Sequence, residues 1–159
     1  MPPVIRKVQE GELEELARLY MRAYRGLERY GEPTPEEGAA YLGWLFSSCP
    51  EGFLVAELEG RPVGFLVCCP DWRPGGTGEP VLEIHELAVD PDFRGQGIAR
   101  ALMEEALRLG RARGRRQASL WVGEGNRPAR EWYRRLGFRE VGRWGEWIRM
   151  RRRLDEGNP

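Results

Sequence analysis

The chain has 159 residues, of which 41% are hydrophobic and 31% are charged, and it carries 25 basic and 25 acidic side chains. This composition is typical of a soluble globular protein, and no apolar run approaches the roughly 20 residues that a membrane helix needs. The zero net charge conceals a split, because residues 1–93 carry 17 acidic and 8 basic side chains whereas residues 94–159 carry 8 acidic and 17 basic ones.

Scarce residue types exclude further classes of protein. The first residues contain no apolar stretch of the kind found in a signal peptide, and the cysteines are few and odd in number, so we expect a cytoplasmic protein. The single histidine, His85, and the lack of a Cys-x-x-Cys pattern predict that no metal is bound. No serine stands in a Gly-x-Ser-x-Gly elbow, which argues against a serine hydrolase.

Hydrophobic periodicity and turn residues predict the elements in chain order. Thr34 has the features of an N-cap, with Pro35 at the first helical position and Glu37 three residues after the cap. Glu59-Gly60 is a two-residue hairpin signal, and the Gly- and Pro-rich residues 70–80 should form a loop. The predicted elements are a strand at 4–9, helices at 12–24 and 35–48, strands at 52–58, 61–69 and 81–89, a helix at 97–113, a strand at 118–122, a helix at 127–136, and a closing hairpin at 138–144 and 146–154.

This order, βααβββαβαββ, predicts one mixed α/β domain over residues 1–159. Its most informative segment is the glycine turn between the strand at 81–89 and the next helix, which reads Arg94-Gly95-Gln96-Gly97-Ile98-Ala99. Glycines let a ligand approach the main chain, and the first N–H groups of a helix favour a phosphate. Arg100 stands where the dinucleotide fingerprint needs its third glycine, and the P-loop pattern is absent. Taken alone, the turn also fits an ordinary connection from strand to helix.

The surrounding residues extend this pattern. The turn matches Gln/Arg-x-x-Gly-x-Gly/Ala at Arg94, Gly97 and Ala99, after a strand that ends at Asp90-Pro91. About 30 residues later, Asn-x-x-Ala-x-x-x-Tyr-x-x-x-Gly-Phe is matched at Asn126, Ala129, Tyr133, Gly137 and Phe138. Over about residues 81–144 the chain therefore resembles the GNAT superfamily of N-acetyltransferases.

The resemblance implies the GNAT fold, a mixed sheet of six or seven strands with about four helices, in which strands 4 and 5 splay apart. It implies direct transfer of an acetyl group from acetyl-CoA to a primary amine of a small molecule or a peptide N-terminus. The alternatives are a non-catalytic module that binds CoA or acyl-CoA, and nucleic-acid binding through the arginine-rich half, for which no motif is present. We expect no nucleic-acid or membrane partner, and a monomer or a homodimer.

The same resemblance assigns cofactor contacts in about residues 81–144. The turn would hold the pyrophosphate, the fourth strand and Asn126 the pantetheine arm, and Arg130 or Arg135 the nucleotide phosphates. The cofactor-binding residues so predicted are Leu87, Ala88, Val89, Arg94, Gly95, Gln96, Gly97, Ile98, Ala99, Arg100, Asn126, Ala129, Trp132, Tyr133 and Arg135.

For catalysis, the match makes Tyr133 the acid toward the leaving thiolate. Glu83 is the first candidate for the base that takes the proton of the amine, with His85 and Glu86 as alternatives. Strand alternation places Glu83 and His85 on one face and Glu86 on the other, unless a bulge changes the phase.

The acceptor would lie near aromatic and acidic side chains of the first helices, the loop before the fourth strand and the final hairpin. The charge split suits two substrates of opposite charge. The anionic cofactor would lie near the basic half of the chain, and a cationic amine would lie near the acidic half. The candidate acceptor residues are Tyr24, Tyr30, Trp44, Trp72, Trp144, Trp147, Glu28, Glu32 and Glu36.

Overall fold

A computed structural model describes residues 2–155. Within them the chain forms two compact units. The first unit comprises residues up to 68 together with Glu86–Ala106, and the second comprises Cys69–His85 together with the residues from 107 onward. The sequence predicts that residues 1–159 form a single domain. Because this depends on how the two units join, it stays a prediction.

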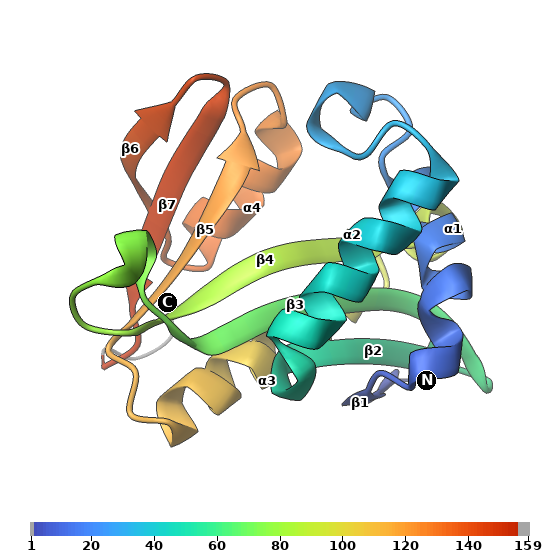
Figure 1. Cartoon of the computed structure of the whole chain (residues 1–159), viewed down its shortest axis with the longest axis horizontal. Helices are drawn as coiled ribbons and strands as arrows, with labels where there is room; N and C mark the ends of the chain where they lie inside the picture. Colours follow the sequence, from blue (N-terminus) through green and yellow to red (C-terminus); the bar gives the residue numbers. More distant parts are fainter. Residues whose placement is uncertain (1, 156–159) are drawn as a thin grey trace. The chain divides into compact units, whose positions relative to one another are not determined.

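The elements follow the predicted order, with the labels of Figure 1. The helices are α1 (Leu13–Ala23), α2 (Pro35–Ser48), α3 (Ile98–Ala112) and α4 (Arg127–Arg135). The strands are β1 (Val4–Lys7), β2 (Phe53–Leu58), β3 (Arg61–Trp72), β4 (Val81–Val89), β5 (Gln117–Gly123), β6 (Arg139–Trp144) and β7 (Trp147–Arg153). Over the described residues they form one seven-stranded sheet in the order β1-β2-β3-β4-β5-β7-β6, which confirms the predicted mixed α/β fold.

The first unit contains β1, β2 and most of β3 in antiparallel pairing, with α1 packed against α2 (Figure 1). The Thr34 hydroxyl accepts a hydrogen bond from the Glu37 N–H at 3.1 Å, which confirms the predicted N-cap. Positive φ angles at Glu59 and Gly60 fit the predicted two-residue hairpin between β2 and β3. The core of this unit includes Leu16, Tyr20, Leu42, Phe53 and Phe65, all nearly inaccessible to solvent.

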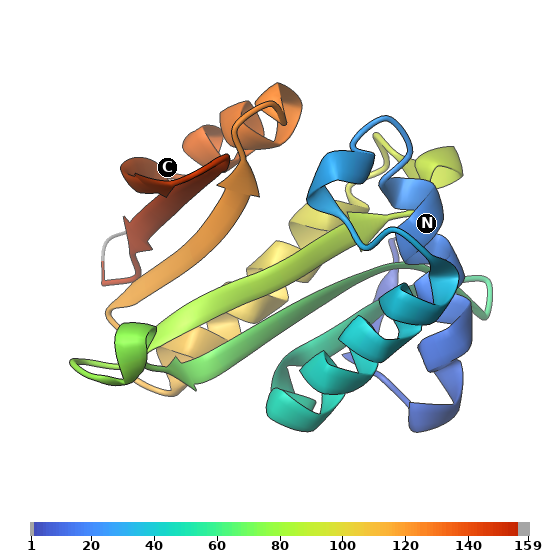
Figure 2. The ribbon, with the colours of Figure 1, turned by 45° about the horizontal axis from the view of Figure 1, so that its top comes forward.

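The second unit contains β5, β7 and β6, which run side by side in antiparallel pairs, and α4 (Figure 2). The first half of β4 pairs with β5 in parallel, through three residue pairs from Leu82↔Ala118 to Ile84↔Leu120. The two strands have nine and seven residues but share only these three pairs, so they pair over a short length, as the predicted splay requires. Leu82, Leu120, Phe138 and Met150 are buried in this unit.

One element departs clearly from the sequence-based prediction. Strand β3 continues through Pro70 to Trp72, three residues into the segment predicted as a loop. A proline only removes an N–H, so it is tolerated where that N–H is not needed for pairing. The other boundaries move by at most two residues. No described helix is long and apolar enough to cross a membrane.

Candidate active site

The end of β4 is fixed by Asp90, which is 2% exposed. Its carboxylate accepts hydrogen bonds from the Asp92 N–H at 3.0 Å and from Arg22 of α1 at 2.7 Å, and its own N–H donates to the Val63 carbonyl. Burial opposes ionisation of Asp90, but the hydrogen bonds from Arg22 and Asp92 hold its pKa below the usual value. The last turn of α1 is thereby attached to the end of β4.

The glycine turn follows after a short 3-10 turn at Pro91–Phe93, and its residues 94–97 are exposed. Gly95 and Gly97 have φ angles of 78° and 80°, and no atom lies within 4 Å of a Cβ added at either position. The helix α3 begins at Ile98, and the Ala101 N–H donates to the Gly97 carbonyl, so the N–H groups between them have no acceptor within the helix. Left-handed backbone, open space and helix N–H groups together fit a bound pyrophosphate.

The arginines predicted beside this turn have partners within the protein. Arg94 donates to the Ala23 carbonyl at 3.0 Å, at the C-terminal end of α1. Arg100 forms an exposed ion pair with Glu104, one turn along α3. The bond from Arg94 to a neutral carbonyl leaves its charge in place, so an anion at the turn would meet this charge as well as the backbone N–H groups.

Glu86 lies among tyrosines of the first unit. It is 8% exposed, and its two carboxylate oxygens accept the Tyr24 hydroxyl at 2.9 and 3.0 Å. The Tyr24 ring lies 4.7 Å from that of Tyr20, whose hydroxyl accepts the Glu32 N–H. Burial raises the pKa of Glu86 to about 8; the Tyr24 hydrogen bond acts against this rise, and the nearby Glu32 adds to it.

Glu83 belongs to the second unit and has a different environment. It is 2% exposed, and the Arg149 guanidinium of β7 donates to both of its oxygens, at 2.7 and 2.9 Å. The buried Ser119 hydroxyl of β5 donates to it as well, at 2.7 Å. This carboxylate is paired with a guanidinium and accepts three hydrogen bonds, which is the arrangement of a structural ion pair.

His85 packs its ring edge-on against Trp72, with the ring centroids 4.7 Å apart. Burial, together with the charge of Arg149, lowers the pKa of His85 to about 4. The imidazole is therefore neutral throughout the physiological range and is a weak base.

The second family segment lies on α4 and just before it. Asn126 precedes the helix and its side chain does not cap it. Tyr133 is half-buried, with its ring 5.3 Å from Trp132 and 5.8 Å from Phe138. Ala129 is partly buried in the same helix, and Arg135 is exposed.

The structure thus distinguishes the three candidate bases that the sequence left open. Among the acceptor candidates, it brings Tyr24 into contact with Glu86 and leaves Trp44 and Trp144 exposed. Arg149 was missed by sequence reasoning, because its partner Glu83 is 66 residues away and no local signal connects them. Arg22 was missed for the same reason.

Comparisons with known proteins agree with these features. The model of the Acetyltransferase (GNAT) family matches residues 13–138. An uncharacterized N-acetyltransferase of Methanocaldococcus jannaschii is 42% identical over 150 residues; the match covers 94% of this chain, which spans 66% of that relative's length.

Two solved structures have the same fold. A protein from Pyrococcus horikoshii OT3 is 37% identical, with a TM-score of 0.85 and coverage of 95% of this chain and 98% of that one. A PaiA N-acetyltransferase from Thermoplasma acidophilum, solved in complex with coenzyme A, is 20% identical, with a TM-score of 0.75 and coverage of 96% and 99%. The chain belongs to the GNAT family of acetyltransferases.

Proposed function

We propose that this protein transfers the acetyl group of acetyl-CoA directly to a primary amine of a small molecule or a peptide N-terminus. The observation that carries the proposal is Glu86, a buried carboxyl group with a pKa near 8, on the strand that leads into the glycine turn. Its setting in a GNAT chain supports catalysis over the alternative of a non-catalytic CoA-binding module.

Glu86 suits the role of general base. An amine must lose a proton to attack a thioester, and a base works best when its pKa lies near the working pH. Glu86 meets this condition, and the Tyr24 hydroxyl orients its carboxylate. Glu83 is already paired with Arg149, and a pKa of about 4 makes His85 too weak a base. We therefore assign the base to Glu86 in place of Glu83.

The other roles are assigned by match to the family segments. Acetyl-CoA supplies an activated thioester. The backbone of Arg94–Ala99 would hold its pyrophosphate, and the main chain of Leu87–Val89 and the Asn126 side chain would hold the pantetheine arm. Tyr133 would protonate the leaving thiolate. An N–H of β4 facing the thioester carbonyl would stabilise the developing oxyanion.

A hollow on α4 offers further contacts for nucleotide phosphates. It has a volume of about 290 Å³ and is lined by Arg127, Arg130, Glu131 and Arg134. Arg130 is held in it by Glu140 and by the Glu124 carbonyl. Of the two arginines predicted from the sequence, Arg130 lines this hollow and Arg135 does not.

A thiol-release assay with acetyl-CoA tests the proposal across amines, amino acids, polyamines and peptides. We expect turnover with at least one class of amine, and losses of about 10²-fold in kcat for Glu86→Gln and for Tyr133→Phe, within the range for removing a general base or acid. Glu105→Gln, on α3, serves as the control and should retain activity. Acetyl-CoA binding without thiol release from any amine would favour the non-catalytic module instead.

A further inference from the structure

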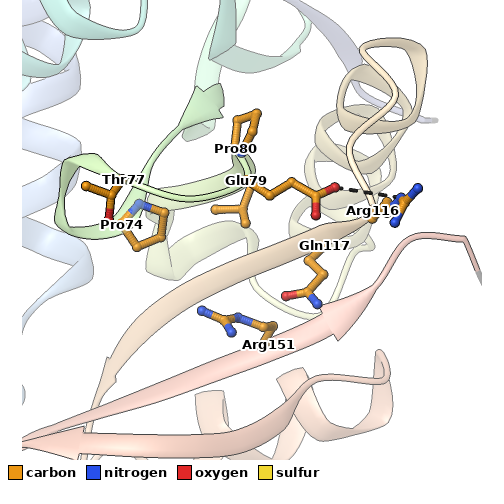
Figure 3. Close-up of a pocket in the computed structure, with 8 residues that line it drawn as sticks. Pro74, Thr77, Glu79, Pro80, Arg116, Gln117 and Arg151 are labelled. Carbon is orange, nitrogen blue, oxygen red and sulfur yellow. Dashed lines mark ion pairs between the residues drawn. The ribbon is translucent and has the colours of Figure 1, made fainter.

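The second unit contains a pocket of about 270 Å³ that the proposed acetyl transfer does not use (Figure 3). One wall is the segment between β3 and β4, which contributes Pro74 and Pro80. The opposite wall is formed by Gln117 at the start of β5 and by Arg151 of β7. The loop wall also contributes Thr77 and Glu79, so two prolines and two polar side chains face a wall rich in hydrogen-bond donors.

The charged residues that line this pocket are two arginines, Arg116 and Arg151, and one carboxylate, Glu79. Arg149 and Arg151 are two residues apart on β7, so both side chains project from the same face of the strand. Arg149 is neutralised by Glu83, whereas the Nε of Arg151 is buried and has no hydrogen-bond partner among the described residues. The lining carboxylate, Glu79, instead turns toward Arg116, with 3.7 Å between the closest N and O atoms (Figure 3).

Because the Nε of Arg151 has no accessible surface, a ligand in the pocket would meet the terminal N–H groups of the guanidinium. A guanidinium recognises oxyanions best, because two of its N–H groups can donate to one carboxylate in parallel. Figure 3 shows the side chains of Gln117 and Arg151 projecting from their strands into the space beneath the loop. The Gln117 amide supplies a further donor beside the arginine.

We propose that this pocket binds a small organic carboxylate, with its oxygens on Arg151 and Gln117 and its carbon chain against Pro74 and Pro80. The volume corresponds to about nine liquid water molecules, which accommodates a short-chain acid. The prolines favour a ligand with a carbon chain over inorganic phosphate. This site is independent of acetyl transfer, since none of these residues has a role in the proposed reaction.

Titration of the full-length ¹⁵N-labelled protein with propionate, propionamide or inorganic phosphate at constant ionic strength tests the site. We expect propionate to shift the Arg151 Nε–H and Gln117 side-chain amide signals saturably, with a dissociation constant on the order of millimolar. Propionamide has the same shape without the charge and should shift neither signal. Phosphate should bind these residues more weakly than propionate does.

Two variants locate the binding, and propionate affinity is read by calorimetry. Arg151→Gln should weaken propionate binding about tenfold or more, the effect of one charge-assisted hydrogen bond. Arg18→Gln changes an exposed arginine of α1 that does not line the pocket, and this variant should bind propionate as the unmodified protein does. If Arg151→Gln does not fold, Gln117→Ala replaces it, with a weaker affinity again expected. The proposal is overturned by the absence of saturable propionate shifts, by equal binding of propionamide, by phosphate binding alone, or by unchanged affinity in the folded variant.

Discussion

Two glutamates on β4 illustrate how the environment of a single residue decides its chemistry. Glu83 forms a buried ion pair with Arg149, so Glu83→Gln would leave a guanidinium uncompensated in the interior. Breaking one partner of a buried pair costs about 3–5 kcal/mol. We expect a loss of unfolding free energy of that order in urea denaturation. A variant that unfolds like the parent but has lost turnover would instead make Glu83 the base.

Tyr24 tunes the proposed base. Its hydroxyl donates to both oxygens of Glu86 and so favours the charged carboxylate, which lowers the pKa that burial has raised. Tyr24→Phe removes this donor, so the pKa of Glu86 should rise further. The rising limb of the pH–rate profile should then move to higher pH. Both proteins are measured with the same acceptor amine, so that the ionisation of the amine affects both profiles equally. Tyr30→Phe is the control. An unshifted limb in Tyr24→Phe would show that Tyr24 does not influence the pKa of the base.

At the scale of the elements, local signals were sufficient to predict most of the helices and strands. The cap at Thr34, the turn at Glu59-Gly60 and the apolar spacing of the helices act within a few residues, so a single sequence displays them. The choice among the three β4 bases depends on partners distant in the chain. The glycine turn was predictable from the family motif, whereas the pairing of Glu83 with Arg149 was not.

The start of β2 offers a sharp test of packing between elements. A Cβ added at Gly52 would lie 1.7 Å from the Cys68 carbonyl oxygen of β3, a backbone atom that cannot move without distorting the strand. We expect Gly52→Ala to destabilise the protein by at least about 2 kcal/mol, within the range for overpacking. Gly43, inside α2, has open space around the added methyl group.

Gly43→Ala is therefore the matched control for Gly52→Ala. It should stabilise the protein by up to about 1 kcal/mol, because alanine is the better helix former. Thermal and urea unfolding of the two variants give the comparison. Similar stabilities would show that β2 and β3 are less closely packed at Gly52 than the structure indicates.

At the scale of the whole molecule, the charge asymmetry persists, but its boundary moves. The first unit carries 16 acidic and 9 basic side chains over its sequence segments, and the second carries 9 and 16. The glycine turn belongs to the acidic unit, although the sequence places it at the start of the basic half. The net charge of its unit therefore does not favour an anion at the turn, which leaves the backbone N–H groups of the turn and its own arginines as the groups that would attract one.

The unfolding free energy of the protein should depend on pH through the ionisation of Glu86. Its pKa is about 8 in the folded state against an ordinary 4.5, so across that interval the folded protein holds a proton that the unfolded chain releases. Its contribution to the unfolding free energy is therefore present at low pH and is lost as the pH rises toward 8. His85 acts oppositely, because its folded pKa of about 4 lies below an ordinary 6.5, and it adds stability as the pH rises through that range.

Between about pH 6.5 and 8 the folded-state histidine is neutral and the unfolded one loses only its remaining half proton, so the fall due to Glu86 outweighs the rise due to His85. We expect the unfolding free energy to fall there by about 1–2 kcal/mol, since one proton gives at most about 1.4 kcal/mol per pH unit. Urea denaturation at closely spaced pH values measures this slope. In Glu86→Gln, which cannot ionise, the slope should vanish, and an equal slope in both proteins would show that the carboxyl group of Glu86 is not held protonated by its burial.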